Sequence, residues 1–440
     1  MNPYFSLLRT NRNYRLLYIG QTISQLGDWF NAVAVFALLL DLTGSATAVA
    51  WMMIVQILPM ALVAPLAGVV VDRVDRRKLM IAADVARGCL ILGLLLVRRG
   101  DQVWLAYVVM ALTVSAAAFF EPSRTATIPN ITTADELLPA NALSSATWSA
   151  MLAIGASVGG IVTAVAGRHV AFVINSASFF VSAFFIGRMR VRSSPAAARP
   201  SSTPAASGLA ALSGYTDLVE GFRYVRHHSH VAALMFVKAG WGLAGGILLL
   251  LTIFGQRVFP VVGSTAAGIG VLYGARGIGA GLGPIVLRSI LGQTPRTLRR
   301  VIGPAYFVVA VFYVALSLAP TLPLAAMSVL FAHVGGSILW VFSSVLLQME
   351  VPDRFRGRVF AAELALVALT TSLSSYWTAY ELDRAGWSPR TMAFALGLLF
   401  CIPGTLWLVF LSRWRAPVGE RLAQDGVEDG TTEVVPYVAP

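Results

Sequence analysis

The sequence predicts an all-α membrane protein with twelve transmembrane helices, and three observations carry this prediction. Of the 440 residues, 57% are hydrophobic and 12% are charged, whereas about 25% of the residues of soluble domains are charged. Apolar runs of roughly 20 residues, the length that crosses a bilayer, recur about twelve times. A stretch rich in Ser, Pro and Ala divides these runs into two equal sets. So few charged residues cannot cover a soluble protein of this size, and the apolar residues must face lipid.

The first set of predicted spans precedes the Ser-, Pro- and Ala-rich stretch. A helix rises about 1.5 Å per residue, so about 20 apolar residues cross a hydrocarbon layer of roughly 30 Å. The fourth span is expected to end at Glu121, because Pro122 follows it and a proline stops a helix. The six ranges lie at roughly 14–40, 47–71, 79–98, 102–121, 139–166 and 169–189.

The second set follows a linker at 190–230, which begins with the flexible Ser-, Pro- and Ala-rich segment. The linker ends in Tyr215–His228, where apolar residues share one helical face, so either a short amphipathic helix at the membrane surface or an ordinary linker helix is expected. The later spans lie at roughly 231–255, 264–288, 299–319, 322–346, 357–381 and 390–412. We therefore expect six-helix units at 1–189 and 231–412, and a disordered tail at 413–440.

The basic residues predict the orientation of the chain. Most of the 33 lysine and arginine residues fall in the N-terminal segment, the linker, the C-terminal tail and the loops on the same side. By the positive-inside rule both termini, the linker and the tail are cytoplasmic, in a multi-pass protein of the cell inner membrane. The net charge of +12 thus serves membrane orientation, and no nucleic-acid partner is expected. The first apolar run is too long for a cleavable signal peptide.

The loop between the second and third predicted spans carries the most specific motif. It reads Gly68-Val-Val-Val-Asp72-Arg73-Val-Asp75-Arg76-Arg77-Lys78. This loop resembles motif A of the major facilitator superfamily of membrane transporters. Asp75 in place of a glycine resembles the drug:proton antiporter branch, which contains macrolide-efflux-like and enterobactin-exporter-like proteins. Further stretches similar to that branch are Gly27–Phe30, Phe120–Arg124, Ile128–Pro129, Tyr273–Gly277 and Val351–Val359.

The resemblance implies two pseudo-symmetric six-helix bundles that rock about a central cavity, which opens alternately to either side. Asp72 can accept hydrogen bonds from the start of the eleventh span near Gly357, where positive charge is also available. We expect this contact to latch the bundles at the cytoplasmic face. The alternative is that the motif only retains topology and solvates a loop. The predicted latch comprises Gly68, Asp72, Arg73, Arg76, Arg77, Glu121, Arg124, Arg356, Gly357 and Arg358.

Acidic residues within the spans are the first candidates for the mechanism. A charge inside a span costs at least about 2.5–3.5 kcal/mol on insertion scales. Asp28, midway along the first span, is expected to face the cavity and to exchange protons or bind a substrate cation. A structural hydrogen bond is the alternative for this residue. Glu363 could be a second proton carrier, or it could pair with Arg358 on its own helix.

Basic residues and a histidine within the later spans leave more alternatives open. Lys238 could bind an anionic substrate group, be displaced by an incoming proton, or pair with a carboxylate such as Asp28. Arg276 lies in a glycine-rich run, which favours a structural counter-ion. His333 is of a type that exchanges protons near neutral pH, although a purely structural histidine is the more common case.

Aromatic and polar residues beside these charges are expected to line the substrate cavity. The glycine-rich run Gly155–Gly160 partly resembles an antiporter motif but lacks its proline, and it is expected to allow close helix packing. The predicted cavity lining consists of Gln25, Trp29, Phe30, Trp241 and Trp340.

Together these features predict a secondary active transporter that exports amphiphilic small molecules, drug-like or siderophore-like, by proton antiport. The alternatives are a transporter of lysophospholipids or other lipids, a proton-independent facilitator, and a non-transporting receptor. The sequence has no P-loop, metalloprotease or serine-hydrolase motif, and Cys89 and Cys401 have no metal-ligand spacing, so we expect neither an enzyme nor a metal site. The proton gradient is the expected coupling source, without a cofactor. The expected partners are a small amphiphilic substrate, protons and membrane lipids, and the expected state is a monomer.

Overall fold

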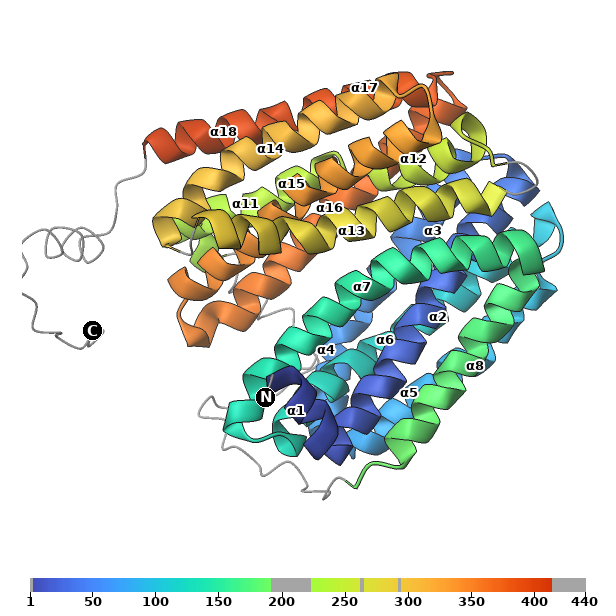
Figure 1. Cartoon of the computed structure of the whole chain (residues 1–440), viewed down its shortest axis with the longest axis vertical. Coiled ribbons are helices and arrows are strands. Elements are labelled where there is room, and N and C mark those ends of the chain that lie inside the picture. The colour runs from blue at the N-terminus through green and yellow to red at the C-terminus, as the bar shows by residue number, and fades with distance from the viewer. Residues whose placement is uncertain (1–2, 191–222, 262–264, 292–293, 414–440) are drawn as a thin grey trace, which may run out of the picture.

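The computed structural model describes residues 3–190, 223–261, 265–291 and 294–413, and nearly all of these residues are helical. Figure 1 shows two groups of helices, one from each half of the chain, that lie side by side. The predicted all-α membrane fold with two bundles is therefore confirmed. Most of the linker and the C-terminal tail lie outside the described residues, as do residues 215–222 of the expected amphipathic helix, of which 223–227 are helical.

The first half of the chain forms the N-terminal bundle. Its helices are α1 (Pro3–Thr10), α2 (Arg12–Thr43), α3 (Ala46–Val55), α4 (Leu58–Arg73), α5 (Arg76–Ile91) with the 3₁₀ turns η1 (Leu92–Leu96) and η2 (Gly100–Gln102), α6 (Val103–Ile131), α7 (Ala134–Ala166) and α8 (Arg168–Gly187). The long helix α2 packs against both α7 and α8, while α5 packs against α6 and α8.

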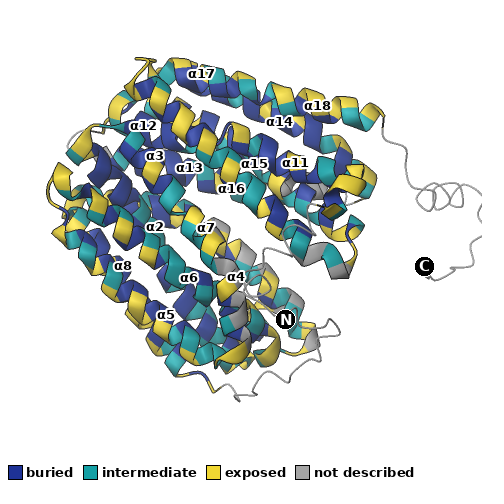
Figure 2. Ribbon diagram, turned by 180° about the vertical axis from the view of Figure 1, so that it is seen from behind, coloured by how far each residue is buried: buried dark blue, intermediate teal, exposed yellow. Residues whose placement is uncertain are grey.

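The second half forms the C-terminal bundle. Its helices are α11 (Ser229–Leu243), α12 (Ile247–Ile253) continued by the π-helical turn η3 (Phe254–Val258), α13 (Thr265–Leu291), α14 (Pro295–Leu318), α15 (Leu322–Glu350), α16 (Asp353–Asp383), α17 (Pro389–Leu399) and α18 (Cys401–Ser412). Figure 2 shows the buried residues gathered on helix faces that point into the bundles, with exposed residues on the outer faces.

Helices occupy all twelve predicted ranges, and ten helical stretches of the described residues are long and apolar enough to cross a membrane. One of the other two ranges is divided between α3 and α4, and Pro59 lies in the first turn of α4. Proline is tolerated there because its missing N–H would have no intrahelical partner in any case. The other range is α13, which lies against α7 of the opposite bundle.

The predicted end of the fourth span at Glu121 is wrong, because α6 continues through Pro122 to Ile131. The hydroxyl of Ser123 donates a hydrogen bond to the carbonyl of Phe119 at 2.7 Å, and that of Thr127 donates to the carbonyl of Ser123 at 2.7 Å. Serine and threonine side chains commonly satisfy the backbone around a proline in a membrane helix. Pro122 therefore lies inside the helix and does not end it.

Small residues bring the two bundles into close contact along α7 and α13. A Cβ atom added to Gly160 would lie 2.8 Å from the Cα atom of Gly270, and one added to Gly277 would lie 2.4 Å from the Cα atom of Ala153. Both distances are too short for a real side chain. The close packing expected of the glycine-rich runs is thereby confirmed.

The bundles are also joined where α2 passes into α3, and we call this end of the molecule the distal end. The carboxylate of Asp383, the last residue of α16, accepts hydrogen bonds from the backbone N–H groups of Ala46 at 3.1 Å and Thr47 at 2.8 Å. It also accepts from the hydroxyls of Ser45 at 2.7 Å and Thr47 at 2.8 Å. A carboxylate is stabilised at a helix N-terminus because the first N–H groups of a helix are unpaired and carry partial positive charge. We call these four contacts the distal clasp.

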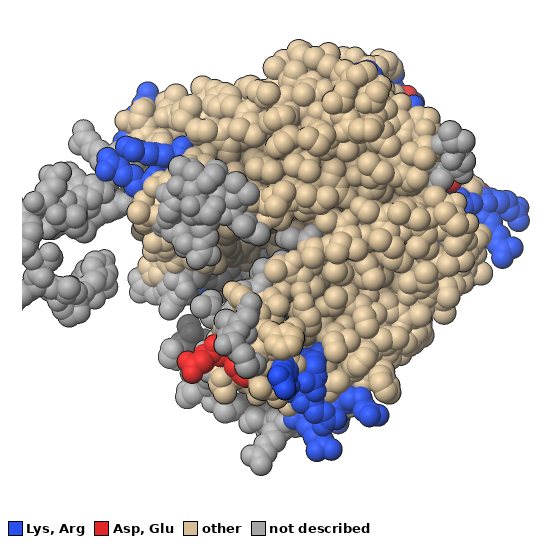
Figure 3. Space-filling view, viewed as in Figure 1, with Lys and Arg blue, Asp and Glu red and all other residues tan. Residues whose placement is uncertain are grey.

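The opposite end, where α2 begins and α18 ends, is the terminal end. Figure 3 shows a hollow between the two bundles that opens toward this end, with basic side chains on the surface of both bundles nearby. At the distal end, by contrast, the clasp is reinforced by Gln256, which donates to Asp41 at 3.3 Å, and by a hydrogen bond from Arg257 to the carbonyl of Gly44. The molecule is thus closed at its distal end and hollowed toward its terminal end.

Candidate functional site

Asp28 lies at the middle of α2 and forms an ion pair with an arginine of α5. The Nη2 atom of Arg87 is 3.0 Å from Oδ2 of Asp28, and the Nη1 atom is 3.3 Å from Oδ1 of Asp84. One guanidinium therefore lies between two carboxylates from different helices. We call Asp28, Arg87 and Asp84 the N-bundle triad.

The triad lies between aromatic rings and is exposed on one side only. The guanidinium of Arg87 lies 4.0 Å from the ring centroid of Phe179 and 5.8 Å from that of Phe120. The side chain of Asp28 is 42% exposed, whereas that of Arg87 is 8% exposed and that of Asp84 is not exposed at all. A lipid-facing carboxylate in the middle of a span would be very costly, so the exposed side of Asp28 is best explained by the hollow between the bundles.

Asp28 is a site residue predicted from the sequence, whereas Asp84 and Arg87 are not among the predicted site residues. A signal was present, since an acid and a base three residues apart on a helix share one face, and both lie within an apolar run. The pairing with Asp28 was not predictable, because Arg87 is 59 positions away along the chain.

A second carboxylate of the N-terminal bundle has its own arginine. Arg124 donates to Oε2 of Glu121 through Nη2 at 2.8 Å and to Oε1 of Gln21 at 3.3 Å. The side chain of Glu121 is 40% exposed and that of Arg124 is 15% exposed. Glu121 and Arg124 thus form a one-to-one pair within α6, next to α2.

The C-terminal bundle contains a sealed ion pair. The Nζ atom of Lys238 in α11 is 2.8 Å from Oε2 of Glu363 in α16, and the two side chains are only 5% and 4% exposed. The ammonium group lies 5.0 Å from the ring centroid of Trp340 and 5.7 Å from that of Phe360. Among the alternatives left open by the sequence, Lys238 pairs with a carboxylate, but that carboxylate is Glu363 and not Asp28.

His333 and Arg276 lie in a separate aromatic cluster of the same bundle. The Nε2 atom of His333 is 2.8 Å from the hydroxyl oxygen of Tyr313, and the histidine ring centroid is 5.8 Å from that of Trp241. The guanidinium of Arg276 lies 5.6 Å from the ring centroid of Tyr273, and its Nε atom has no hydrogen-bond partner. Among the described residues, no hydrogen bond or ion pair is recorded between either of these residues and Lys238 or Glu363.

The residues predicted to line the cavity differ in their exposure. Trp340 is 45% exposed and Trp241 is partly buried, whereas Phe30 is buried in the core. A Cβ atom added to Gly159 would lie 2.8 Å from the Cα atom of Phe30, so this part of α2 packs against α7. Trp29 packs against Gly155 in the same way, and the buried Oε1 atom of Gln25 has no hydrogen-bond partner. Phe30 is thus a packing residue, contrary to the expectation that it lines the cavity.

The motif A segment anchors α5 within its own bundle. Asp75 accepts hydrogen bonds from the backbone of Arg77 at 2.9 Å and of Lys78 at 3.2 Å, and so caps α5. Arg76 donates to the carbonyl of Ala126 at 3.0 Å, and Arg77 donates to those of Ile186 and Gly187. Arg73 is exposed, and Arg358 lies over the ring of Phe355.

The central contact of the expected latch falls outside the described side chains. Gly68 and Asp72 belong to α4, and Arg356 and Gly357 belong to α16, but their side-chain surroundings are not described. The latch between these two helices stays a prediction.

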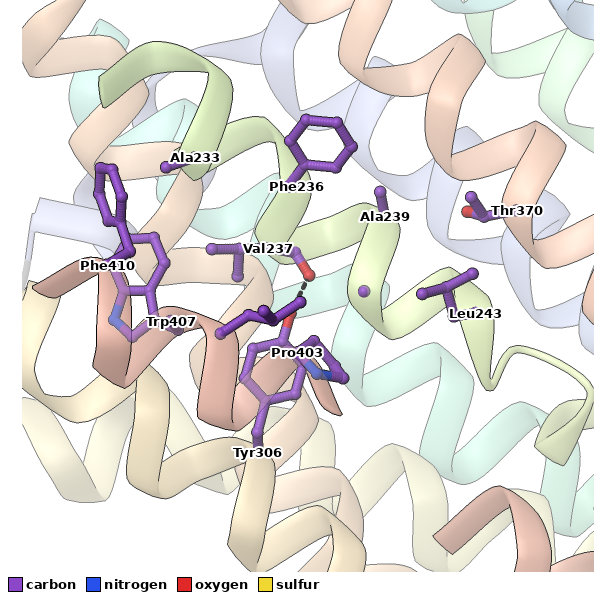
Figure 4. A pocket seen from close by; sticks show the side chains of 12 residues that line it. Ala233, Phe236, Val237, Ala239, Leu243, Tyr306, Thr370, Pro403, Trp407 and Phe410 are labelled. Carbon is purple, nitrogen blue, oxygen red and sulfur yellow. Dashed lines mark hydrogen bonds between the residues drawn. The ribbon is translucent and has the colours of Figure 1, made fainter. Parts of the chain in front are cut away.

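An apolar groove of about 330 Å³ lies elsewhere, between α11, α14, α16 and α18. Figure 4 shows its lining, with Phe236, Trp407 and Phe410 around Pro403 and a hydrogen bond from the Tyr306 hydroxyl to the carbonyl of Val237. Its lining residues Phe236, Leu243 and Leu406 are exposed, as a lipid-contacting groove would require. The groove is distinct from both ion networks.

Comparison with known proteins identifies the family. Residues 4–383 match the model of a family described as transmembrane secretion effector. The protein named "Putative bacilysin exporter BacE" from Bacillus subtilis is 25% identical over 375 residues, which cover 84% of this chain and 88% of that protein. Macrolide efflux protein A from Streptococcus pyogenes is 29% identical over 123 residues, or 28% of this chain and 30% of that protein.

Solved transporter structures share the fold. A bacterial homologue of the human lysosomal transporter Spinster, in an inward-facing and unoccupied conformation, has a TM-score of 0.67 and 15% identity, and the match covers 93% of this chain and 99% of that one. The nucleoside transporter NupG has a TM-score of 0.66 and 11% identity, with 94% and 100% covered. The family match and the exporter relatives point to a transporter and not to an enzyme, as the sequence predicts. The chain therefore belongs to the transmembrane secretion effector family of the major facilitator superfamily.

Proposed function

We propose that this protein exports an amphiphilic small molecule across the cell membrane in exchange for protons. The relatives named for bacilysin export and macrolide efflux support export of small organic molecules. The orientation of the proposal, with both termini and the hollow on the cytoplasmic side, is supported by the basic residues of the terminal end. In this orientation a substrate enters from the cytoplasm and leaves after the distal clasp opens.

The observation that carries the exchange for protons is Asp28. It is an ionisable group at the middle of a membrane helix, it is 42% exposed, and its arginine partner is buried behind it. Such a carboxylate can gain or lose a proton from the hollow without unfolding of the helix. Protonation weakens its attraction to Arg87, and this change links the proton to the packing of α2 on α5.

Flux through reconstituted proteoliposomes tests the proposal. Uptake of a macrolide and of bacilysin is measured with and without a pH gradient, for the wild type, for Asp28→Asn, and for Asp101→Asn as a control at an exposed turn. We expect a pH gradient to drive accumulation in the wild type and the control, and at least about a tenfold loss with Asp28→Asn, equal to about 1.4 kcal/mol. Uptake that stops at equal concentrations inside and outside, with or without the pH gradient, would indicate a proton-independent facilitator. If neither the macrolide nor bacilysin is transported, lysophospholipids are tested in the same assay. If no lipid is transported either, a receptor is favoured.

A further inference from the structure

The N-bundle triad holds two acidic groups and a single basic group. Arg87 contacts Asp28 at 3.0 Å and Asp84 at 3.3 Å, through different nitrogen atoms of the same guanidinium. With both carboxyls ionised, the three side chains carry a net charge of −1. Their surroundings include the rings of Phe120 and Phe179. An uncompensated charge shared by the unexposed Asp84 and the nearly buried Arg87 is unfavourable, and the exposed side of Asp28 relieves only part of this cost, so the neutral triad is favoured.

Among the described residues, the other charged groups recorded as interacting with the triad do not supply the missing positive charge. Glu121 of α6 is close enough to interact electrostatically with Asp28 and Asp84, and it adds negative charge. Its partner Arg124, at 2.8 Å, balances it. From α8, the residues facing the triad are the ring of Phe179 and the hydroxyl of Ser182. Neither of these carries a charge, so the triad is left with an excess of one acidic group.

Unpaired polar atoms lie at the sealed end of the triad. The Oδ2 atom of Asp84 and the Oγ atom of Ser182 are both buried and both lack a hydrogen-bond partner among the described residues. Buried polar atoms are usually paired, so each unpaired atom calls for an explanation. Ser182 is near enough to exchange a hydrogen bond with that carboxyl, as acceptor from a protonated Asp84 or as donor to an ionised one, so this contact fits both positions of a proton in the triad.

We propose that Asp28, Arg87 and Asp84 bind one proton as a single unit. In one neutral arrangement the proton is on Asp84 and Arg87 pairs with the Asp28 carboxylate. In the other the proton is on Asp28 and Arg87 pairs with the Asp84 carboxylate. Only Asp28 is exposed, so the proton passes to and from water through Asp28, and Asp84 holds Arg87 in place while it does so. The role of this unit in transport rests on the proposed antiport. The number of protons that it binds does not depend on that proposal.

Infrared spectroscopy of the purified protein in lipid nanodiscs, without substrate, tests the proton count. The C=O stretch of a protonated carboxyl group is identified by its shift in D₂O. At neutral pH we expect one such group in the wild type and none in Asp28→Asn or Asp84→Asn, because either substitution leaves one carboxylate for one arginine. Asn at position 84 has the shape of the protonated acid, so this variant should fold. Glu121→Gln, the matched carboxylate with its own arginine, should keep the signal.

Changing the basic member provides an independent measurement. Arg87→Lys preserves the charge and should keep one protonated carboxyl, whereas Arg87→Gln should show more than the wild type. If Arg87→Gln does not fold, the number of protonated carboxyl groups in Arg87→Lys still tests the proposal. Absence of the signal in the wild type, or its survival in Asp28→Asn or Asp84→Asn, would overturn the proton-binding unit. A wild type that shows the signal but no gradient-driven flux would instead overturn only the proposed antiport.

Discussion

Each bundle holds an ion network in its interior, and the two networks differ in charge and in access. The N-bundle triad has two carboxylates for one arginine, and one carboxylate is 42% exposed. The pair of Lys238 and Glu363 has one charge of each sign, and both side chains are at most 5% exposed. The Lys238–Glu363 pair is balanced in charge and has almost no access to water, whereas the triad has one carboxylate in excess and an exposed member through which a proton can pass. If the proposed antiport holds, this difference favours proton exchange in the N-terminal bundle and a structural role for the C-terminal pair.

The largest expected effect comes from removing one member of the sealed pair. Lys238→Met leaves Glu363 charged and buried without its partner, which should lower the free energy of unfolding by about 3–5 kcal/mol. Chemical unfolding in mixed micelles measures this loss. The double substitution Lys238→Met with Glu363→Met should recover most of it, since two apolar residues leave no buried charge. A single variant as stable as the wild type would contradict the structural role.

A second test asks whether the sealed pair takes part in coupling. The same double variant has no ionisable group at this place, so we expect it to keep gradient-driven accumulation within about threefold of the wild type, a change of under about 1 kcal/mol. Asp28→Asn should lose at least about tenfold in the same assay. A double variant that transports without responding to the pH gradient would move proton exchange to the C-terminal bundle.

A third prediction concerns the distal clasp, at the end of the molecule opposite the hollow. Asp383→Asn removes the negative charge of the distal clasp, and an amide accepts weaker hydrogen bonds than a carboxylate. We expect the closed state to lose about 1 kcal/mol, or about fivefold in population. Distances between spin labels on α3 and α16 would measure this. Glu381→Gln is the control on the same helix, since Glu381 bonds to Trp377 and not to the other bundle. Equal distance distributions for the two variants would show that the clasp does not hold the bundles together.

The smallest effect is expected for the exposed pair on α6. Glu121→Gln removes an ion pair between residues three apart, one of which is 40% exposed. Such pairs contribute about 0.2–1 kcal/mol. Unfolding in the same micelles should show a loss within that range, well below the loss for Lys238→Met. If Glu121→Gln lowers the free energy of unfolding as much as Lys238→Met does, exposure does not explain the difference in stability between the two ion pairs.

Much of the fold was predictable because a bilayer imposes a length on each span. The runs of about 20 apolar residues gave helices in all the expected places, since lipid offers no partners for any other backbone arrangement. The prediction at Pro122 is wrong because a proline ends a helix in water more often than in a membrane, and here α6 continues through it to Ile131.

The site was less predictable than the fold. Composition identified Asp28, Lys238 and Glu363 as charges inside spans, but not their partners. Lys238 and Glu363 are 125 positions apart, and their contact depends on how α11 packs on α16. Packing angles are set by many side chains together, and no local pattern encodes them. The spacing of Asp84 and Arg87 was the one local sign of the triad.

The seam between α7 and α13 has a consequence for the speed of opening. Gly160 meets Gly270, and Gly277 meets Ala153, at separations that leave no room for interlocking side chains. Two helices that touch through backbone atoms can pivot on each other without moving side chains from one rotamer to another. We therefore expect little activation energy from this surface, and the clasp at Asp383 to be the main obstacle to rocking. A bulky residue placed in the contact between α7 and α13 would then hinder the pivoting of these helices and slow the transport cycle, even with both ion networks intact.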